Sequence, residues 1–386
     1  MKKFSFGKPF MALATLSVAF ALAFAGCSGG GSEFDEEFNV TSADFDSTFE
    51  NIHATPGHYL INLSGNLLDY QGIYMETAGV NITVRGTGAN RITLKDVMSV
   101  VAGKLTLENI ALSRGTGNSA DILFYLKGGT VEIKNGVTIS NNNGTDYFSG
   151  VFLDDNSVFI MSGGVIENCD FGIIGRGGNN SSITISGGII RNNSTGIRLD
   201  NTTTVKVTGG TFENHQYGGI GTGAKGVTIN ISGGTFRNNL DNVYELIALW
   251  NDAANCTVNI TGGEFIKSNG DYPSAVFIRG NGNHVTMSNG KITSDWVAVF
   301  FDETTATECS FTLSRGEVTG AVTGIMIGGS RNTVTVSGGS LKGTSEVGIF
   351  VWRGNGHTVT KTGGTVTGGN HPYYVGDSAQ ATVTGF

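Results

Sequence analysis

The chain has 386 residues, of which 60 are Gly and only 4 are Pro, and its 24 basic and 32 acidic side chains give a net charge of −8. Glycine far above its usual share of about 7%, without abundant proline, excludes collagen, and 39% hydrophobic residues exclude a disordered linker. The acidic balance gives no electrostatic reason to bind nucleic acid. A protein of short strands and many turns remains, which is typical of an internal repeat.

Residues 1–26 have the features of an export signal. Three lysines precede an apolar stretch over residues 11–25, which is too short to span a bilayer comfortably. The stretch ends in Phe24-Ala25-Gly26-Cys27, which resembles a bacterial lipobox and implies that Cys27 is lipidated. Ordinary cleavage after Ala25 is the alternative. We expect an exported protein held to the cell envelope, at the outer membrane or the cell surface, by a lipid on Cys27.

A tether and a cap are expected between this signal and the repeats. Residues 27–41 begin with a Gly/Ser stretch, which predicts a flexible tether. Residues 42–56 predict an N-terminal cap with a short helix, because Phe45, Phe49 and Ile52 would share one helical face. Such a helix would close the open end of a repeat domain that covers residues 57–386.

One motif, a small residue followed by Gly-Gly and then apolar positions, governs the repeat domain. Nine copies with eight intervals give a mean period of 25 residues, although Asn or Arg replaces the first Gly in two of them. Each copy contains three strand-like pieces with alternating apolar residues. The copies start at Ser162, Ser186, Thr208, Ser232, Thr261, Ser288, Ser314, Ser337 and Thr362.

Two positions of the motif predict how it folds. The residue two after each start is Gly in all nine copies, as expected where the backbone needs a positive φ. The residue four after each start is apolar in every copy and is predicted to point inward. These apolar residues are Ile166, Ile190, Phe212, Phe236, Phe265, Ile292, Val318, Leu341 and Val366.

The repeat resembles a right-handed parallel β-helix of the pectate-lyase type. The resemblance implies an all-β fold with three short strands per coil and about 11–12 coils at the observed period. The register places Cys256 and Cys309 in one column two coils apart, roughly 9–10 Å at one strand spacing per coil. Disulfides need closer Cα atoms, so we expect neither a disulfide nor a cysteine metal site.

Carboxylates flank the third strand piece of many copies, where enzymes of this fold carry their acids. The weak catalytic candidates are Asp170, Asp241 and Asp271. The catalytic pattern of the family does not carry over, because Asn-Thr-Asp and Arg-x-Lys are absent and no Gly follows His357. Most of these acids are interpreted as turn residues. No cofactor is expected, although Ca²⁺ between carboxylates of adjacent coils remains an alternative.

The outward side of the same strand piece carries aromatic and Arg side chains. Alternation places Ile197 and Leu199 inside and Arg198 outside. Aromatic faces stack on sugars, while Arg and Asp meet hydroxyls or carboxylates, so this side is a candidate glycan platform. Loops that cover the rings are the alternative. The candidate ligand-binding residues are Phe152, Arg198, Trp250, Arg279, Phe300, Phe350, Trp352 and Arg353.

Together these features favour an envelope-anchored surface β-helix that binds glycans or host or matrix proteins without catalysis. A polysaccharide lyase or glycoside hydrolase that acts on uronate polymers is the first alternative, and a structural spacer is the second. The expected partners are a membrane, reached through the lipid anchor, and a polysaccharide or a host or matrix protein, with no nucleic acid.

Overall fold

The computed structural model describes residues 33–115, 121–141, 147–240, 245–269 and 274–386. Residues Phe34–Phe386 form one compact unit, separate from residues 1–33. The export signal, Cys27, Asp241 and Asp271 lie outside the described residues.

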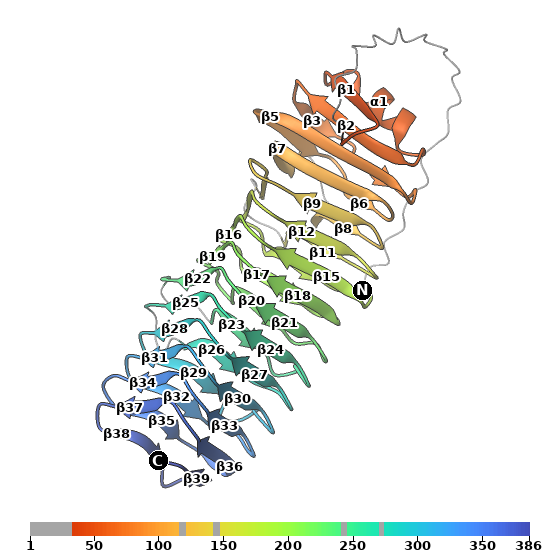
Figure 1. The fold of residues 1–386 in the computed structure, drawn as a ribbon. Helices are drawn as coiled ribbons and strands as arrows, with labels where there is room; N and C mark the ends of the chain where they lie inside the picture. The colour runs from red at the N-terminus through yellow and green to blue at the C-terminus, as the bar shows by residue number, and fades with distance from the viewer. Residues whose placement is uncertain (1–32, 116–120, 142–146, 241–244, 270–273) are drawn as a thin grey trace. The chain divides into compact units, whose positions relative to one another are not determined.

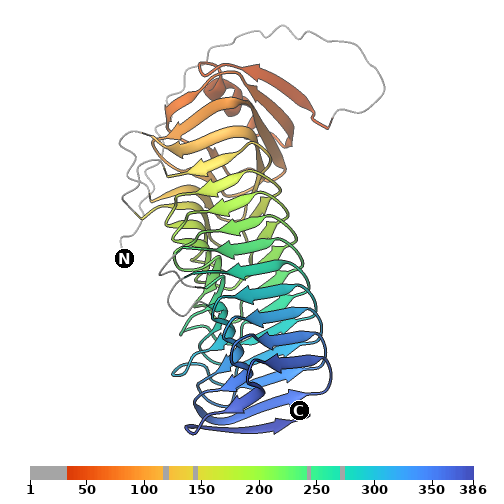
Figure 2. The same cartoon turned by 90° about the vertical axis from the view of Figure 1, so that its left-hand side faces the viewer.

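The unit Phe34–Phe386 is an all-β parallel solenoid of about 14 turns with one short helix near its N-terminus. Successive coils place their strands side by side along one axis (Figure 1, Figure 2). The predicted fold class is confirmed. The number of coils exceeds the expected 11–12, because residues 36–115 form coils without the small-Gly-Gly motif.

Each repeat contributes one strand to each of three parallel stacks, here called the first, second and third stack. Neighbouring strands within the first stack come from consecutive coils. The first stack consists of β1 (Glu36–Val40), β2 (Gly57–Leu63), β9 (Thr130–Ile133), β12 (Val158–Met161), β15 (Ser181–Ile185), β18 (Thr203–Val207), β21 (Thr228–Ile231), β24 (Thr257–Ile260), β27 (His284–Met287), β30 (Ser310–Leu313), β33 (Thr333–Val336), β36 (Gly354–Lys361) and β39 (Ala379–Thr384), joined by the first halves of β5 (Val80–Leu94) and β7 (Lys104–Arg114).

The second stack lies across a corner from the first, and the second halves of β5 and β7 run on into it. It consists otherwise of β3 (Leu67–Tyr70), β10 (Thr138–Ser140), β13 (Val165–Glu167), β16 (Ile189–Arg191), β19 (Thr211–Glu213), β22 (Thr235–Asn238), β25 (Glu264–Lys267), β28 (Lys291–Ser294), β31 (Glu317–Gly320), β34 (Ser340–Gly343) and β37 (Thr365–Gly368).

The third stack is a separate sheet of 13 strands. Its members are β4 (Tyr74–Met75), β6 (Met98–Val100), β8 (Ile122–Leu126), β11 (Ser149–Leu153), β14 (Phe171–Gly175), β17 (Thr195–Leu199), β20 (Ile220–Thr222), β23 (Ile247–Leu249), β26 (Ser274–Ile278), β29 (Val297–Phe301), β32 (Thr323–Ile327), β35 (Val347–Val351) and β38 (His371–Val375).

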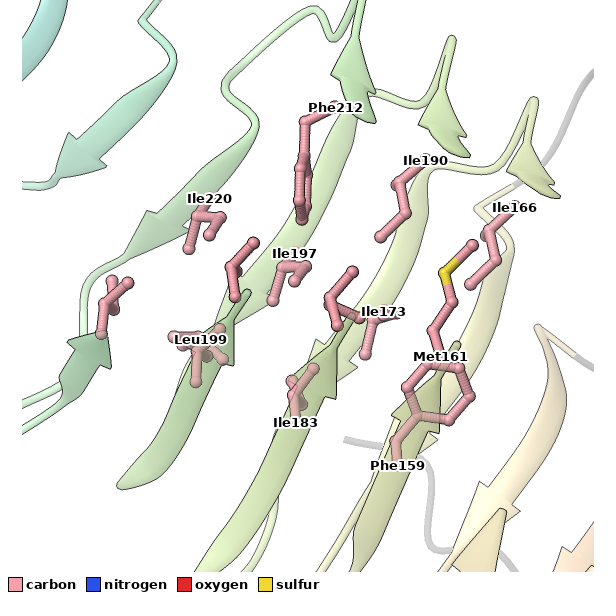
Figure 3. Packing of buried hydrophobic residues seen from close by; sticks show 14 of the residues in the cluster. Phe159, Met161, Ile166, Ile173, Ile183, Ile190, Ile197, Leu199, Phe212 and Ile220 are labelled. Atoms are coloured by element: carbon pink, nitrogen blue, oxygen red, sulfur yellow. The ribbon is translucent and has the colours of Figure 1, made fainter. Parts of the chain in front are cut away.

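Equivalent apolar residues of successive coils stack in register inside the solenoid. Ile190, Phe212, Phe236 and Phe265 are consecutive partners on neighbouring strands of the second stack, and all are buried. The ring centroids of Phe212 and Phe236 lie 4.4 Å apart, and those of Phe236 and Phe265 4.7 Å apart. Figure 3 shows Phe212 and its neighbours facing the isoleucines of the third stack, including Ile197. The predicted inward column is therefore confirmed.

The corner between the first and second stacks depends on glycine. The second Gly of the motif has a positive φ in all nine copies, for example +87° at Gly210. A Cβ there would lie 3.1 Å from the carbonyl oxygens of Gly187 and Gly188 on the preceding coil. Both the left-handed backbone and the close approach of consecutive coils exclude a larger residue at this corner.

The N-terminal end is covered by α1 (Phe45–Ile52), as the sequence predicts (Figure 1). Phe45, Phe49 and Ile52 are buried, and the ring of Phe45 lies edge-on to Tyr70 at 5.6 Å. The expected tether needs a correction, because residues 36–40 form strand β1, which pairs in parallel with β2. The solenoid therefore begins before the cap helix.

The cysteines occupy the positions that the repeat register predicts. Cys256, Asn283 and Cys309 precede consecutive strands of the first stack, so the two thiols are two coils apart. The backbone N–H of Cys256 donates to Oδ1 of Asn283 at 2.9 Å. Cys169 lies at another corner, and all three thiols are buried and free.

Candidate binding face

The outward side of the third stack carries the residues that the sequence singled out. It is called here the third-stack face, and β17 to β38 can be followed along it in Figure 1. One in-register row runs through its strands and consists of Tyr125, Phe152, Ile174, Arg198, Gly221, Ala248, Phe277, Phe300, Met326, Phe350 and Tyr374.

A second row follows directly after the strands, where backbone hydrogen bonds continue the ladder between coils. It consists of Lys127, Asp154, Arg176, Asp200, Gly223, Trp250, Arg279, Asp302, Gly328 and Trp352. The eight predicted ligand-binding residues therefore lie on one face: four in the first row, three in the second, and Arg353 beside it. Their rings are half-buried rather than fully exposed, because they pack against one another.

Aromatic side chains form a nearly continuous group on the C-terminal half of the face. The rings of Phe277 and Phe300 stack with centroids 5.1 Å apart, and Trp352 lies 6.4 Å from Phe300. Trp296 meets Phe300 edge-on at 5.8 Å, and Phe350 lies 5.7 Å from Tyr374. The name aromatic ribbon is used below for Phe277, Trp296, Phe300, Phe350, Trp352 and Tyr374.

Two arginines lie on these rings and are each paired with an acid. The guanidinium of Arg279 is 4.0 Å from the centroid of Phe277, and that of Arg353 is 4.6 Å from the centroid of Trp352. Asp302 forms an ion pair with Arg279, in which Oδ2 lies 3.6 Å from Nε of the arginine. Burial alone would raise the pKa of Asp302, but hydrogen bonds from Thr304 and Thr305 outweigh it and lower the pKa. The carboxyl group of Asp302 is therefore ionised at neutral pH.

A second cluster surrounds Arg198 in the middle of the face. Its Nε donates to Asp200 at 2.9 Å, and its guanidinium lies 4.9 Å from the ring of Phe171 and 5.3 Å from that of Trp250. The indole of Trp250 lies against Gly221 of the preceding coil, where a Cβ would approach Cζ2 to 2.3 Å. The missing side chain at Gly221 lets the indole lie flat on the strand.

A third cluster lies at the N-terminal part of the face. The hydroxyl of Tyr125 donates to Oδ2 of Asp154 at 2.7 Å, and the ring of Phe152 lies 5.7 Å from that of Tyr125. Burial would raise the pKa of Asp154, but donors that include Tyr125 and the backbone N–H of Gly178, with Lys127 nearby, lower it. Asp154 thus also stays ionised and cannot serve as a proton donor near neutral pH.

Of the three catalytic candidates, only Asp170 lies among the described residues. Asp170 precedes β14, and its Oδ2 is buried with no hydrogen-bond partner among the residues that the structure describes. Asp241 and Asp271 belong to segments 241–244 and 270–273, which lie outside the described residues. A shallow groove does occur, but it lies at the glycine corner and is lined by residues such as Gly290, Lys291 and Glu317.

Several residues of the face were missed from the sequence. Tyr125 and Tyr374 are register partners of Phe152 and Phe350, so extending the predicted column by one coil at a time would have found them. Trp296 lies outside that column and has no such signal.

Glu245 is buried, and burial raises its pKa to about 7 against the opposing charges of Arg279 and Lys267. Nothing in its sequence neighbourhood indicates a buried carboxyl group.

The fold and this face together define a parallel β-helix protein that presents an aromatic and charged surface on one sheet. The family model for NosD, described as a periplasmic copper-binding protein, matches residues 61–275, and the chain belongs to this family. No curated protein and no solved structure matches the chain. In the described part of the chain, no helix combines the length and the apolar character that a membrane crossing requires.

The described residues do not fit a copper site. Copper favours Cys, Met and His donors, but the described residues contain no group of three or more His, Cys, Asp or Glu placed to hold a metal ion. Burial raises the pKa of the Cys256 and Cys309 thiols, which point to carbonyl oxygens of Ala224 and Gly280. Thiols that stay protonated are poor ligands. Of the described methionines, Met75, Met98, Met161 and Met287 belong to the core of the solenoid, and Met326 is buried on the third-stack face.

Proposed function

We propose that this protein is an exported, lipid-anchored β-helix that binds glycans on the third-stack face without cleaving them. The aromatic ribbon carries the proposal, since the rings of Phe300, Phe350 and Trp352 are half-buried. The guanidinium of Arg353 lies over the ring of Trp352. Ring faces stack on the C–H surfaces of sugars, and the guanidinium and carboxylate groups provide hydrogen bonds to hydroxyls. Export is supported by the periplasmic description of the family, and lipidation of Cys27 would hold the chain at the envelope.

The charges on the face favour binding over catalysis. Glycoside hydrolysis needs one carboxylic acid with a raised pKa close to a second carboxylate. The pKa of both Asp154 and Asp302 is lowered, so these groups remain ionised. Glu245 does have a raised pKa, but only 7% of its surface is exposed, so a substrate cannot reach it. A lyase or hydrolase is therefore the weaker alternative, and a protein ligand of host or matrix origin is an outcome of the test.

A glycan array probed with the mature chain tests the proposal. We expect Trp352→Ala to weaken retention of the bound glycan about tenfold, which corresponds to about 1.4 kcal/mol of binding free energy. Arg353→Ala should also weaken binding. Arg237→Ala is the matched control, because Arg237 is 57% exposed and pairs with Glu213 on the second stack, while Arg353 is 55% exposed and pairs with Glu303.

Three results would reject the proposal. The first is a wild-type chain that retains no glycan, and the second is equal loss of binding in the Arg237→Ala control and the Arg353→Ala variant. The third is release of unsaturated or new reducing ends from a bound polymer, which would show an enzyme.

A further inference from the structure

We infer that the third-stack face recognises an uncharged glycan, an inference that rests on the proposed function and specifies its ligand. Every ion pair on the face joins a basic side chain to an acid of the same or a nearby coil. These pairs are Lys127–Asp154 at 3.8 Å, Arg176–Asp200 at 3.9 Å, Arg198–Asp200 at 2.9 Å, Arg279–Asp302 at 3.6 Å and Arg353–Glu303 at 2.8 Å.

These pairs give each of the basic side chains a carboxylate partner, with five bases sharing four acids. Asp200 is shared by Arg176 and Arg198, and the pKa of Asp154 and of Asp302 is lowered, so both carboxyl groups are ionised at neutral pH. A polyanionic glycan would have to displace these carboxylates from their cations or lie beside them, and like charges across an interface cost binding free energy. The net charge of −8 adds to this repulsion.

The arginines are placed to support rings rather than to capture anions. The guanidiniums of Arg279 and Arg353 lie over the faces of Phe277 and Trp352 while each forms an ion pair with an acid. A guanidinium has five N–H donors in a fixed fork. The donors that remain suit hydroxyl oxygens, which accept a hydrogen bond without bringing a charge.

The register of the face also indicates how such a glycan would lie. Phe277, Phe300, Met326, Phe350 and Tyr374 are direct partners on consecutive coils. Consecutive strands are about 4.8 Å apart, which is close to the length of one unit in an extended β-linked sugar chain. Phe277 and Met326 are only 5% and 7% exposed. An unbranched glycan along the solenoid axis would therefore contact chiefly the rings of Phe300, Phe350 and Tyr374, over about four units at this spacing.

The test compares matched neutral and acidic hexasaccharides. The neutral probes are β-1,4-linked glucose, mannose, xylose and N-acetylglucosamine, and the acidic probes are uronate hexasaccharides of β-1,4 and α-1,4 linkage. We expect at least one neutral probe to bind about tenfold tighter than every uronate. Its affinity should stay constant between about 50 mM and about 500 mM NaCl, because screening acts on charged ligands. Trisaccharides should bind more weakly than hexasaccharides.

A charge variant sharpens the result. Glu303→Gln releases Arg353 from its acid and should raise the affinity for uronates about threefold or more at low salt. Glu213→Gln, which releases Arg237 on the second stack, is the control and should change nothing. Preferred and salt-sensitive binding of uronates by the wild type would overturn the inference and leave glycan binding intact. Binding of neither class would overturn the proposed function, and the inference with it.

Discussion

The imidazole of His215 is enclosed by the solenoid, with only 2% of the residue exposed. Neither ring nitrogen has a hydrogen-bond partner among the described residues. Burial lowers the pKa of His215 to about 4, and the nearby backbone of Asn193 and Ile190 opposes this only in part. Gly196 lies next to the ring, since a Cβ there would be 2.9 Å from Nε2. The side chain of His215 is therefore neutral at pH 7 and becomes protonated only in acid.

Acid should destabilise the protein through His215. The folded pKa of about 4 lies below the unfolded value of about 6.5, so the unfolded chain binds more protons between these two values. Stability is therefore present above pH 6.5 and is lost as the pH falls toward 4, by up to about 3 kcal/mol. We expect His215→Leu to lose less stability than the wild type between pH 7.5 and pH 4.5, measured by urea unfolding at about these two values. A variant with the same acid sensitivity as the wild type would contradict this assignment.

Glu245 has the opposite effect on the pH dependence. Burial raises its folded pKa to about 7, with Asp302 adding to the rise and Arg279 and Lys267 opposing it. The folded state then holds a proton that the unfolded state has lost, so the contribution of Glu245 to stability falls as the pH rises from about 4.5 toward 7. The two residues partly cancel in that window, and the comparison of His215→Leu with the wild type isolates the histidine.

At the scale of a single strand, apolar side chains of consecutive coils pack on one another. Phe236 of β22 is stacked on Phe212 and Phe265 of the two neighbouring coils. Replacing Phe236 with Ala removes both ring contacts and leaves a cavity, which should cost about 3–5 kcal/mol. Urea unfolding measures this loss. Thr235→Ala is the control, because Thr235 is half-buried on the outward side of the same strand and should change stability by less than about 0.5 kcal/mol. Equal effects of the two changes would refute the packing assignment.

The elements were predictable wherever the motif is intact. From Ser162 onward, alternation gave the inward and outward sides, and Gly210 and its equivalents marked the corners. The early coils were not predictable in detail, because β5 and β7 run through the corner without a Gly-Gly pair. In β5 a register shift between Arg85 and Asn90 replaces the corner. A bulge of this kind leaves no repeat signature.

The candidate site was predictable as a surface but not as a set of contacts. The column that contains Phe152, Arg198 and Phe350 follows from strand alternation alone. The direction in which a long side chain leans does not follow from alternation. The indole of Trp250 lies back across Gly221 only because the neighbouring coil offers a glycine there. Side-chain contacts between coils, such as that of Trp250 with Gly221, depend on which coils become neighbours and on the length of each turn.

At the scale of the whole molecule, the fold class followed from the period, whereas the family did not. Many functions share the parallel β-helix, and the repeat itself encodes corners and core rather than chemistry. The family assignment comes from the match over residues 61–275, and the copper in its description has no matching donor group among the described residues of this chain.

The proposed lipid anchor at Cys27 is tested on a chain that includes residues 1–32. Cys27→Ala should move the protein from the membrane fraction to the soluble fraction, because the proposed lipid would be attached to the thiol of Cys27. Cys169→Ala is the control and should stay with the membranes, since the Cys169 thiol is buried in the solenoid. Unchanged fractionation of Cys27→Ala would show that the protein is held by other means.

The in-register pairing of coils has an evolutionary consequence. Ile190, Phe212 and Phe236 occupy the same place on successive coils. Duplication of one complete coil would therefore add one residue to every in-register row and leave the pairing of the other coils unchanged. Loss or gain of a single strand residue would instead turn the following side chains to the opposite side. Such a protein can grow or shrink in whole-coil steps, and the length of the third-stack face would change by the same increment.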